Sequence, residues 1–257
     1  MAIHPSAIID SGARVDPSAE IGPFCVVGEG VVIGARTRLK GHIFVEGPTT
    51  IGTDNLFYPF SSIGVASQDL KYEGEHAETH IGNHNLIREF VTVHRGTKGG
   101  GALTRVDDPN LLMGYCHVAH DCHVGSHVVL GHGATLGGHV KVGDHARVSA
   151  FAGIHQFCRI GAHSIIGGYA VITRDVLPFA MVSEEREAKM YRANSVGLER
   201  RGFPPEQIEV INKAFRFLRT EGLLADAITR MRTELPSSEA ITQLIDFIER
   251  SERGFLK

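Results

Sequence analysis

The sequence predicts a left-handed parallel β-helix followed by an α-helical C-terminal domain. Two observations carry this prediction: aliphatic side chains recur at every sixth residue over most of the chain, and a Gly often follows them. Neither the 3.6-residue period of a helix nor the two-residue alternation of a strand produces such spacing. A hexapeptide period is typical of a β-helix, in which three units, each a short strand plus a turn, close one triangular coil.

The aliphatic series runs in two phases, from Ile9 to Val93 and from Val106 to Ile172. We expect these side chains to point inward and to stack on their equivalents in neighbouring coils. In pairs such as Ile21-Gly22, the Gly is expected to supply positive φ or close backbone approach at the corners.

Two segments interrupt the repeat. Residues 64–80 (GVASQDLKYEGEHAETH) are polar and aperiodic, yet Ile63 and Ile81 are eighteen residues apart, so the phase survives. Residues 94–105 (HRGTKGGGALTR) hold a Gly run and shift the phase by one residue. Both segments are expected to be loops on the coil, and loops on a rigid scaffold often carry function.

From about residue 186 the apolar pattern changes to the helical period. Ile208, Ile211, Phe215 and Leu218 follow helical spacing, and two similar sets follow within 224–248. Residues 202–205 (GFPP) are interpreted as a linker into the first helix of this region. The predicted domains are therefore a β-helix over 1–185 and an α-helical domain over 186–257.

Composition narrows the function classes. The net charge is −3, so the composition does not indicate the basic surface that binds nucleic acid. The four Cys lack the spacing of a disulfide scaffold, which favours free thiols in a reducing compartment. No apolar run reaches membrane-spanning length and no signal peptide is recognised, so we expect a cytoplasmic protein without a transmembrane segment.

His residues are the main candidates for chemistry. The chain holds fifteen, and they are densest in residues 116–124 (CHVAHDCHV). Within a coil only Val118 and Val124 of this segment are expected to face the core. His120, Gly138-His139 and His155-Gln156 are separated by roughly one coil of eighteen residues, so they are predicted to form a column along one edge.

Three interpretations of these imidazoles remain open from the residues alone. Outward His side chains are commonly solvated surface groups. Imidazoles on a β-helix also bind zinc at subunit faces. A positioned imidazole can act as a general base, and Asp121 directly after His120 could orient it.

Several segments, in order along the chain, resemble the UDP-N-acetylglucosamine O-acyltransferases, enzymes of the first step of lipid A synthesis. They are SQDLKY at 67–72, VHRGT at 93–97, AHDC at 119–122, GHV at 138–140, HQFC at 155–158 and RRGF at 200–203. A hexapeptide repeat alone is also typical of acetyltransferases and γ-class carbonic anhydrases. The combination of QDLKY, AHDC and HQFC is specific.

The resemblance implies transfer of an (R)-3-hydroxyacyl chain from acyl carrier protein to the 3-hydroxyl of UDP-N-acetylglucosamine. His120 matches the family's general base, and Asp121 would orient its imidazole. The backbone N–H of Gly138 matches the donor to the oxyanion. The resemblance implies neither a cofactor nor a bound metal.

Further matches imply substrate contacts. Asp69 matches the residue that binds the acyl 3-hydroxyl, and Gly168 lies in the region that limits acyl length. Without the motif, Arg200-Arg201 would be interpreted as a solvated pair at a helix start. The residues implied to contact the sugar or the acyl chain are Gln68, Asp69, Lys71, His94, His117, His139 and Gly168, and those on the nucleotide side are His155, Gln156, Asn194, Arg200 and Arg201.

Hexapeptide proteins as a class cover their faces by side-by-side association, so we expect a homotrimer with active sites between subunits. The small residues Gly167-Gly168 favour a long acyl chain of about fourteen carbons. Open alternatives are the N-acyltransferase of lipid A synthesis, a γ-carbonic-anhydrase-like zinc enzyme and a non-enzymatic scaffold. A 3-amino analogue of UDP-N-acetylglucosamine as acceptor also stays open.

Overall fold

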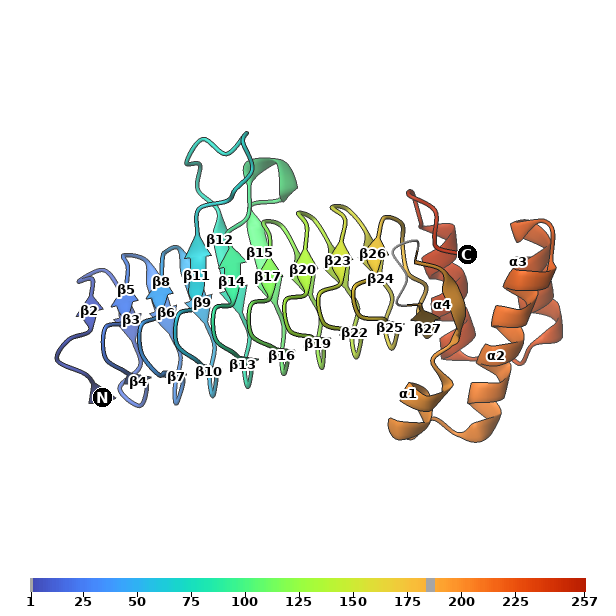
Figure 1. The fold of residues 1–257 in the computed structure, drawn as a ribbon, viewed down its shortest axis with the longest axis horizontal. Coiled ribbons are helices and arrows are strands. Elements are labelled where there is room, and N and C mark those ends of the chain that lie inside the picture. Colours follow the sequence, from blue (N-terminus) through green and yellow to red (C-terminus); the bar gives the residue numbers. More distant parts are fainter. Residues whose placement is uncertain (1, 184–187) are drawn as a thin grey trace.

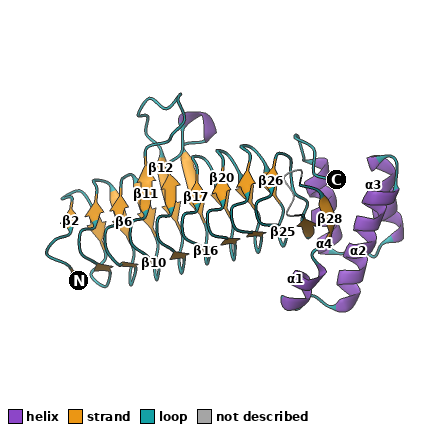
Figure 2. Ribbon diagram, in the orientation of Figure 1, coloured by secondary structure: helices purple, strands orange, loops and turns teal. Residues whose placement is uncertain are grey.

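The computed structural model describes residues 2–183 and 188–257, and its coils form one elongated prism with helices at the C-terminal end (Figure 1). Successive strands rotate through three parallel sheets, which we call A, B and C, and every third strand is a neighbour within one sheet. The helices gather at one end, apart from a single short turn in a side loop (Figure 2).

The strands are short because each one fills one face of the triangular coil. Sheet A holds β1 (Ala2–Ile3), β4 (Glu20–Ile21), β7 (Arg38–Leu39), β10 (Leu56–Phe57), β13 (Leu86–Ile87), β16 (Leu111–Leu112), β19 (Val129–Leu130), β22 (Arg147–Val148), β25 (Ile165–Ile166), β27 (Ala180–Val182) and β28 (Met190–Ala193). Sheet B holds β2 (Ile8–Ile9), β5 (Val26–Val27), β8 (Phe44–Val45), β11 (Ser62–Val65), β14 (Thr92–His94), β17 (His117–Val118), β20 (Thr135–Leu136), β23 (Gly153–Ile154) and β26 (Val171–Ile172). Sheet C holds β3 (Arg14–Val15), β6 (Val31–Ile33), β9 (Thr49–Ile51), β12 (Glu78–Ile81), β15 (Leu103–Val106), β18 (His123–Val124), β21 (Lys141–Val142) and β24 (Arg159–Ile160).

The aliphatic series forms the core, as predicted. From Ile21 to Ile172 its members are at most 3% exposed, and each stands in register with its equivalents one coil before and after, as Leu112, Leu130 and Val148 do. Val118 and Val124 face inward, but Cys116 and Cys122 of the same segment are equally buried. Small thiols therefore also fill the corners of the core, which the hexapeptide pattern did not indicate.

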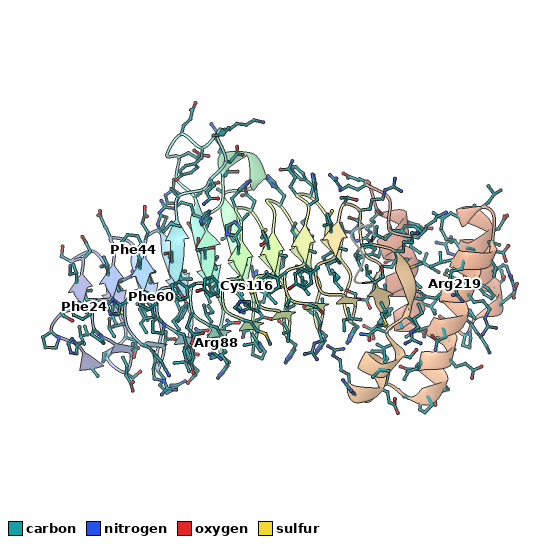
Figure 3. All side chains as sticks on the ribbon, viewed as in Figure 1. Phe24, Phe44, Phe60, Arg88, Cys116 and Arg219 are labelled. Atoms are coloured by element: carbon teal, nitrogen blue, oxygen red, sulfur yellow. The ribbon has the colours of Figure 1, made fainter. Side chains whose placement is uncertain are left out.

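The Gly residues that follow the aliphatic series act by close approach, whereas Gly133 takes a positive φ of 66° at a corner. A Cβ on Gly22 would lie 2.1 Å from Lys40 O, and one on Gly161 would lie 2.2 Å from Pro178 N. The left-handed corner positions are instead occupied mostly by aromatic, His, Asp and Arg residues, which costs about 1–3 kcal/mol per residue. The aromatic rings among them stack on rings of neighbouring coils, as Phe60 and Phe90 do with ring centroids 5.0 Å apart. This stacking offsets part of the conformational cost. Phe24 and Phe60 project from the coil, whereas Cys116 lies inside it (Figure 3).

Both interruptions of the repeat lie at the same edge of the prism, between sheets B and C. Ile63 and Ile81 occupy consecutive strands, so eighteen residues span a six-residue step and twelve are inserted. Val93 and Val106 are likewise consecutive at thirteen residues, an insertion of seven. The resulting loops, which we call the long loop (66–77) and the short loop (95–102), project side by side (Figure 1).

The helical region is entered differently from the prediction. The expected change to helix at about 186 is wrong in part, because β28 first runs antiparallel to β27. Four helices follow: α1 (Ser195–Arg200), α2 (Pro205–Thr220), α3 (Leu224–Glu234) and α4 (Glu239–Glu249). Residues 202–205 lead into α2, which is the second helix of this region and not the first. The preceding helix α1 was not predicted, because six residues are too few to show a helical period. The proposed domain boundary at 185/186 lies outside the described residues.

The C-terminal segment is anchored to the last coil. Asp175 accepts a hydrogen bond from Ser251 Oγ at 2.8 Å, and its backbone carbonyl accepts one from Leu256 N at 2.9 Å. Among the helices of the described residues, none has the length and apolar character needed to cross a membrane.

Because the inward side chains stack on one another, truncation of one of them should lower the free energy of unfolding substantially. We expect Leu130→Ala to lower the free energy of unfolding by about 2–5 kcal/mol, because the gap lies between two fully packed neighbours. Thr135→Ala, on the exposed face of the next strand, should change it by less than about 0.5 kcal/mol. Urea denaturation measures both, and equal effects would contradict the inward stacking.

Candidate active site

The predicted column lies at the edge between sheets B and C. His120, Gly138 and Gln156 occupy equivalent positions on three coils, and His139 N donates to His120 O at 3.0 Å while Phe157 N donates to Gly138 O at 2.9 Å. His155 lies one position earlier and is exposed beside the C-terminal segment, where Arg253 Nη2 lies 3.4 Å from its Nδ1. The ring that stacks on His139 is Phe157, at 4.3 Å.

His120 and Asp121 form a hydrogen-bonded pair. Their Nδ1 and Oδ2 atoms are 2.7 Å apart, and the imidazole side chain is 12% exposed. The pairing of adjacent residues is possible because Asp121 has a positive φ of 59° and turns the corner instead of continuing a strand. Since an ionised carboxylate only accepts, the bond assigns the proton to Nδ1 and leaves Nε2 as the acceptor.

Asp121 is enclosed by the short loop. Its carboxylate, with no exposed surface, accepts from Thr97 N at 2.8 Å and from Thr97 Oγ1 at 2.6 Å. Its own N–H donates to Thr104 Oγ1 at 2.7 Å. The sequence analysis assigned no role to either Thr, although the phase shift at 94–105 marked the loop that positions Thr97.

Gly138 allows the imidazole of His120 to lie directly against the backbone. A Cβ at this position would be 2.5 Å from His120 Nε2, so no larger residue fits without moving the ring. Among the described residues, the N–H of Gly138 donates no hydrogen bond. The site therefore presents a free backbone donor next to the free nitrogen of His120.

Two further imidazoles pack beneath this pair. His94 is 4% exposed and meets His117 edge to face at 4.9 Å, and His117 Nδ1 lies 2.7 Å from Thr92 Oγ1. Burial, reinforced by His117 and His120, lowers the pKa of His94 to about 4. Burial also lowers the pKa values of His117 and His139. These rings are thus kept neutral around His120.

The same groups offer a test of the zinc interpretation. His120, Asp121 and His139 present ligand atoms within 4.8 Å of one another. The Asp121 carboxylate, however, already accepts from Thr97 N, Thr97 Oγ1 and His120. A metal there would displace these bonds, so the donor set fits a His–Asp pair better than a metal centre.

Asp69 of the long loop acts electrostatically on this cluster. Its charge acts to raise the pKa of His139 against the larger effect of burial. Asp69 Oδ1 accepts from Lys71 N at 3.0 Å, which shapes the loop. Gln68 and Lys71 are exposed, and their side chains make no described hydrogen bond to the histidines.

Three nucleotide-side candidates line a separate pocket of about 490 Å³ between sheet A and α1. Arg201 Nη2 donates to His145 O at 2.7 Å, and its pKa is lowered by burial and then by Arg147. The guanidinium groups of Arg200 and Arg201, which both line this pocket, suit a diphosphate. Asn194 is engaged structurally: it caps α1 through Gly197 N and donates to His163 O.

The comparisons with known proteins agree over the full chain. A curated acyl-(acyl-carrier-protein)-UDP-N-acetylglucosamine O-acyltransferase from Thermodesulfovibrio yellowstonii is 45% identical, over 99% of both chains. Another from Xanthomonas campestris pv. campestris is 47% identical over 99% of this chain and 97% of the relative. The chain belongs to the UDP-N-acetylglucosamine O-acyltransferase family.

Family models and solved structures support the same assignment. The model described as UDP-N-acetylglucosamine O-acyltransferase, domain 2, matches residues 175–256, and the bacterial transferase hexapeptide model matches 104–138 and 139–174. LpxA from Acinetobacter baumannii superposes with a TM-score of 0.97 at 41% identity, over all of both chains. A UDP-N-acetylglucosamine acyltransferase from Bacteroides fragilis gives 0.97 at 37%, over 99% of this chain and 100% of the other. The predicted fold, a left-handed parallel β-helix with C-terminal helices, is confirmed.

One copy of this acyltransferase distributes the candidate residues over different edges. The His120 cluster and Gln156 lie between sheets B and C, Gly168 lies at the corner between sheets A and B, and Arg201 lies against sheet A. Arg200 ends α1 and Arg201 follows it, so the alternative of a solvated pair at a helix start does not describe these residues.

The buried His94 predicts a pH-dependent stability. Its pKa is about 4 in the folded protein and about 6.5 in an unfolded chain. Between these values the unfolded state binds more protons, so the free energy of unfolding should fall as pH drops from 6.5 to 4. The expected slope is at most about 1.4 kcal/mol per pH unit for this one group.

Urea titrations at several pH values test this effect. His94→Asn removes one titrating group and should reduce the slope between pH 6.5 and 4, where the buried His163 still contributes; His123→Asn, at an exposed ring, should leave the slope unchanged. An unchanged slope in His94→Asn would contradict the assignment.

Proposed function

We propose that this protein transfers an (R)-3-hydroxyacyl chain from acyl carrier protein to the 3-hydroxyl of UDP-N-acetylglucosamine, the first step of lipid A synthesis. The observation that carries the proposal is the His120–Asp121 pair, whose imidazole lies against Gly138, a residue whose backbone N–H donates no hydrogen bond among the described residues. The names of the relatives supply the substrates, and the geometry supplies roles for the residues.

In the proposed reaction, His120 Nε2 accepts the proton of the sugar 3-hydroxyl as that oxygen attacks the thioester carbonyl. Asp121 holds the imidazole and stabilises the imidazolium. The negative charge that develops on the carbonyl oxygen is met by the N–H of Gly138. Collapse of the tetrahedral intermediate expels the carrier-protein thiolate, which takes the proton back from Nε2. No cofactor enters this balance.

The remaining candidates are assigned to binding. Asp69, with Gln68 and Lys71 in the same loop, would accept a hydrogen bond from the acyl 3-hydroxyl; an acyl chain without this group leaves a polar acceptor unpaired and is disfavoured. His94, His117 and His139 shape a neutral wall for the sugar and acyl chain. Arg200 and Arg201 would bind the diphosphate, while His155 and Gln156 would reach the nucleotide from the His120 edge.

We further propose that the working unit is a homotrimer with active sites between subunits. A single copy separates the base, the acyl-length position and the Arg pocket onto different edges of the prism. One substrate contacts all three only if neighbouring copies bring unlike edges together. Symmetric association of this kind is common among soluble oligomers.

His120→Ala tests the base. We expect kcat to fall by about two to four orders of magnitude with 3-hydroxymyristoyl-acyl carrier protein as donor and UDP-N-acetylglucosamine as acceptor, because proton removal is lost. His123→Ala, an exposed His on the same coil paired with Asp107, is the matched control and should remain active. Robust turnover by the His120 variant would overturn the base assignment. Activity only toward the 3-amino acceptor would correct the substrate.

Gly168→Met tests acyl length. A Cβ at Gly168 would meet Ala150 O at 3.3 Å without a positive φ, so a side chain fits there once the backbone shifts by a few tenths of an ångström. The added thioether should fill the groove and shift the preference from about fourteen carbons to a shorter chain, at about 0.8 kcal/mol per methylene lost. Competition between acyl donors of different length measures this shift. An unchanged preference would place the length limit elsewhere.

A further inference from the structure

The short loop adds a group to the site that the family resemblance did not assign. Seven inserted residues bring Thr97 onto the carboxylate of Asp121, where its N–H and its hydroxyl both donate. Thr97 is itself 6% exposed, and Asp121 is sealed from solvent. A chain of contacts therefore runs from Thr97 through Asp121 to His120 Nδ1.

The packing around this chain leaves little room for an alternative arrangement. A Cβ on Gly100 would lie 2.0 Å from Cγ of Asp121, so the loop backbone closes directly over the carboxylate. The loop is tied down in turn, because Lys98 N donates to Glu75 Oε1 of the long loop at 3.0 Å. Hydrogen bonds from Lys98 and other backbone groups hold the pKa of Glu75 below its usual value, which keeps it an ionised acceptor.

We propose that Thr97 is a positioning residue for acyl transfer, which fixes the rotation of the Asp121 carboxylate so that Oδ2 stays aligned with His120 Nδ1. This inference rests on the proposed function of His120. Oδ2 is shared between Thr97 Oγ1 and His120 Nδ1, so loss of the hydroxyl removes one of two restraints on that oxygen. The enclosure excludes a replacing water, and the carboxylate must rotate or remain under-bonded.

The effect should appear in kcat and not in substrate binding. Thr97 acts through Asp121, and a small misplacement of a catalytic group costs up to about a hundredfold in rate. We expect Thr97→Val, which keeps the shape and removes the hydroxyl, to lower kcat by about ten- to a hundredfold with KM for UDP-N-acetylglucosamine within about twofold. Thr97→Ser restores the donor and should stay within about threefold of wild type.

The matched control is Thr79→Val. Thr79 is a fully buried Thr of β12 that stands in register with Thr104, so it undergoes the same chemical change one coil away without touching Asp121. Its kcat should equal that of wild type. If Thr97→Val lowers stability too far to be assayed, Gly100→Ala replaces it, because its Cβ must push the loop off the carboxylate and should lower kcat in the same way.

A spectroscopic reading tests the inference without substrate. In protein labelled with ¹⁵N-histidine, the Nδ1–H proton of His120, identified by its absence in His120→Ala, should be protected and far downfield in wild type. It should broaden or move upfield in Thr97→Val and return in Thr97→Ser. An unaltered resonance in Thr97→Val, an unaltered kcat, or equal loss in the Val and Ser variants would overturn the role of Thr97. Turnover retained by His120→Ala would instead overturn the base assignment on which this inference rests, and absence of acyl transfer by the wild type would refute the proposed function, so these failures are distinct.

Discussion

Every feature of this molecule depends on the stacking of one aliphatic side chain per six residues. Because each inward residue packs on its equivalent one coil away, a corner residue also lies over its equivalent in the next coil. That register aligns His120 with Gly138 and aligns Asp121, His139 and Phe157 beside them. The column of proposed catalytic residues is thus a consequence of core packing, and a slip of one residue would turn the imidazole away.

The proposed catalytic residues lie where the repeat is broken. Both insertions leave the coil at the edge between sheets B and C, the same edge that holds His120. The long loop brings Asp69 close enough to act on His139, and the short loop closes over Asp121. A regular coil would leave a His–Asp pair exposed to water, whereas the loops bury it and fix its hydrogen bonds. The rigid prism therefore fixes the position of His120, and the two loops bury the His120–Asp121 pair.

Local sequence pattern predicted the parts governed by a short period. The buried series, the His120 column and the two loops follow from spacing alone, and the segment 202–205, predicted to be a linker, leads into α2, which begins at its last residue. The antiparallel β28, the six-residue α1 and the contact of Thr97 with Asp121 did not follow. Each of these depends on a long-range partner or is too short to show a period. Likewise, His155 was expected in the column, but the left-handed corner places Phe157 on His139.

The central claim is that His120 Nε2 is the atom that receives the proton of the acceptor. A crystal structure of the protein with UDP-N-acetylglucosamine bound tests this most directly. The account predicts the sugar 3-hydroxyl within about 2.6–3.2 Å of His120 Nε2, with the diphosphate held by Arg200 or Arg201 of a neighbouring subunit. A sugar whose 3-hydroxyl faces another residue, with His120 Nε2 contacting solvent alone, would contradict it.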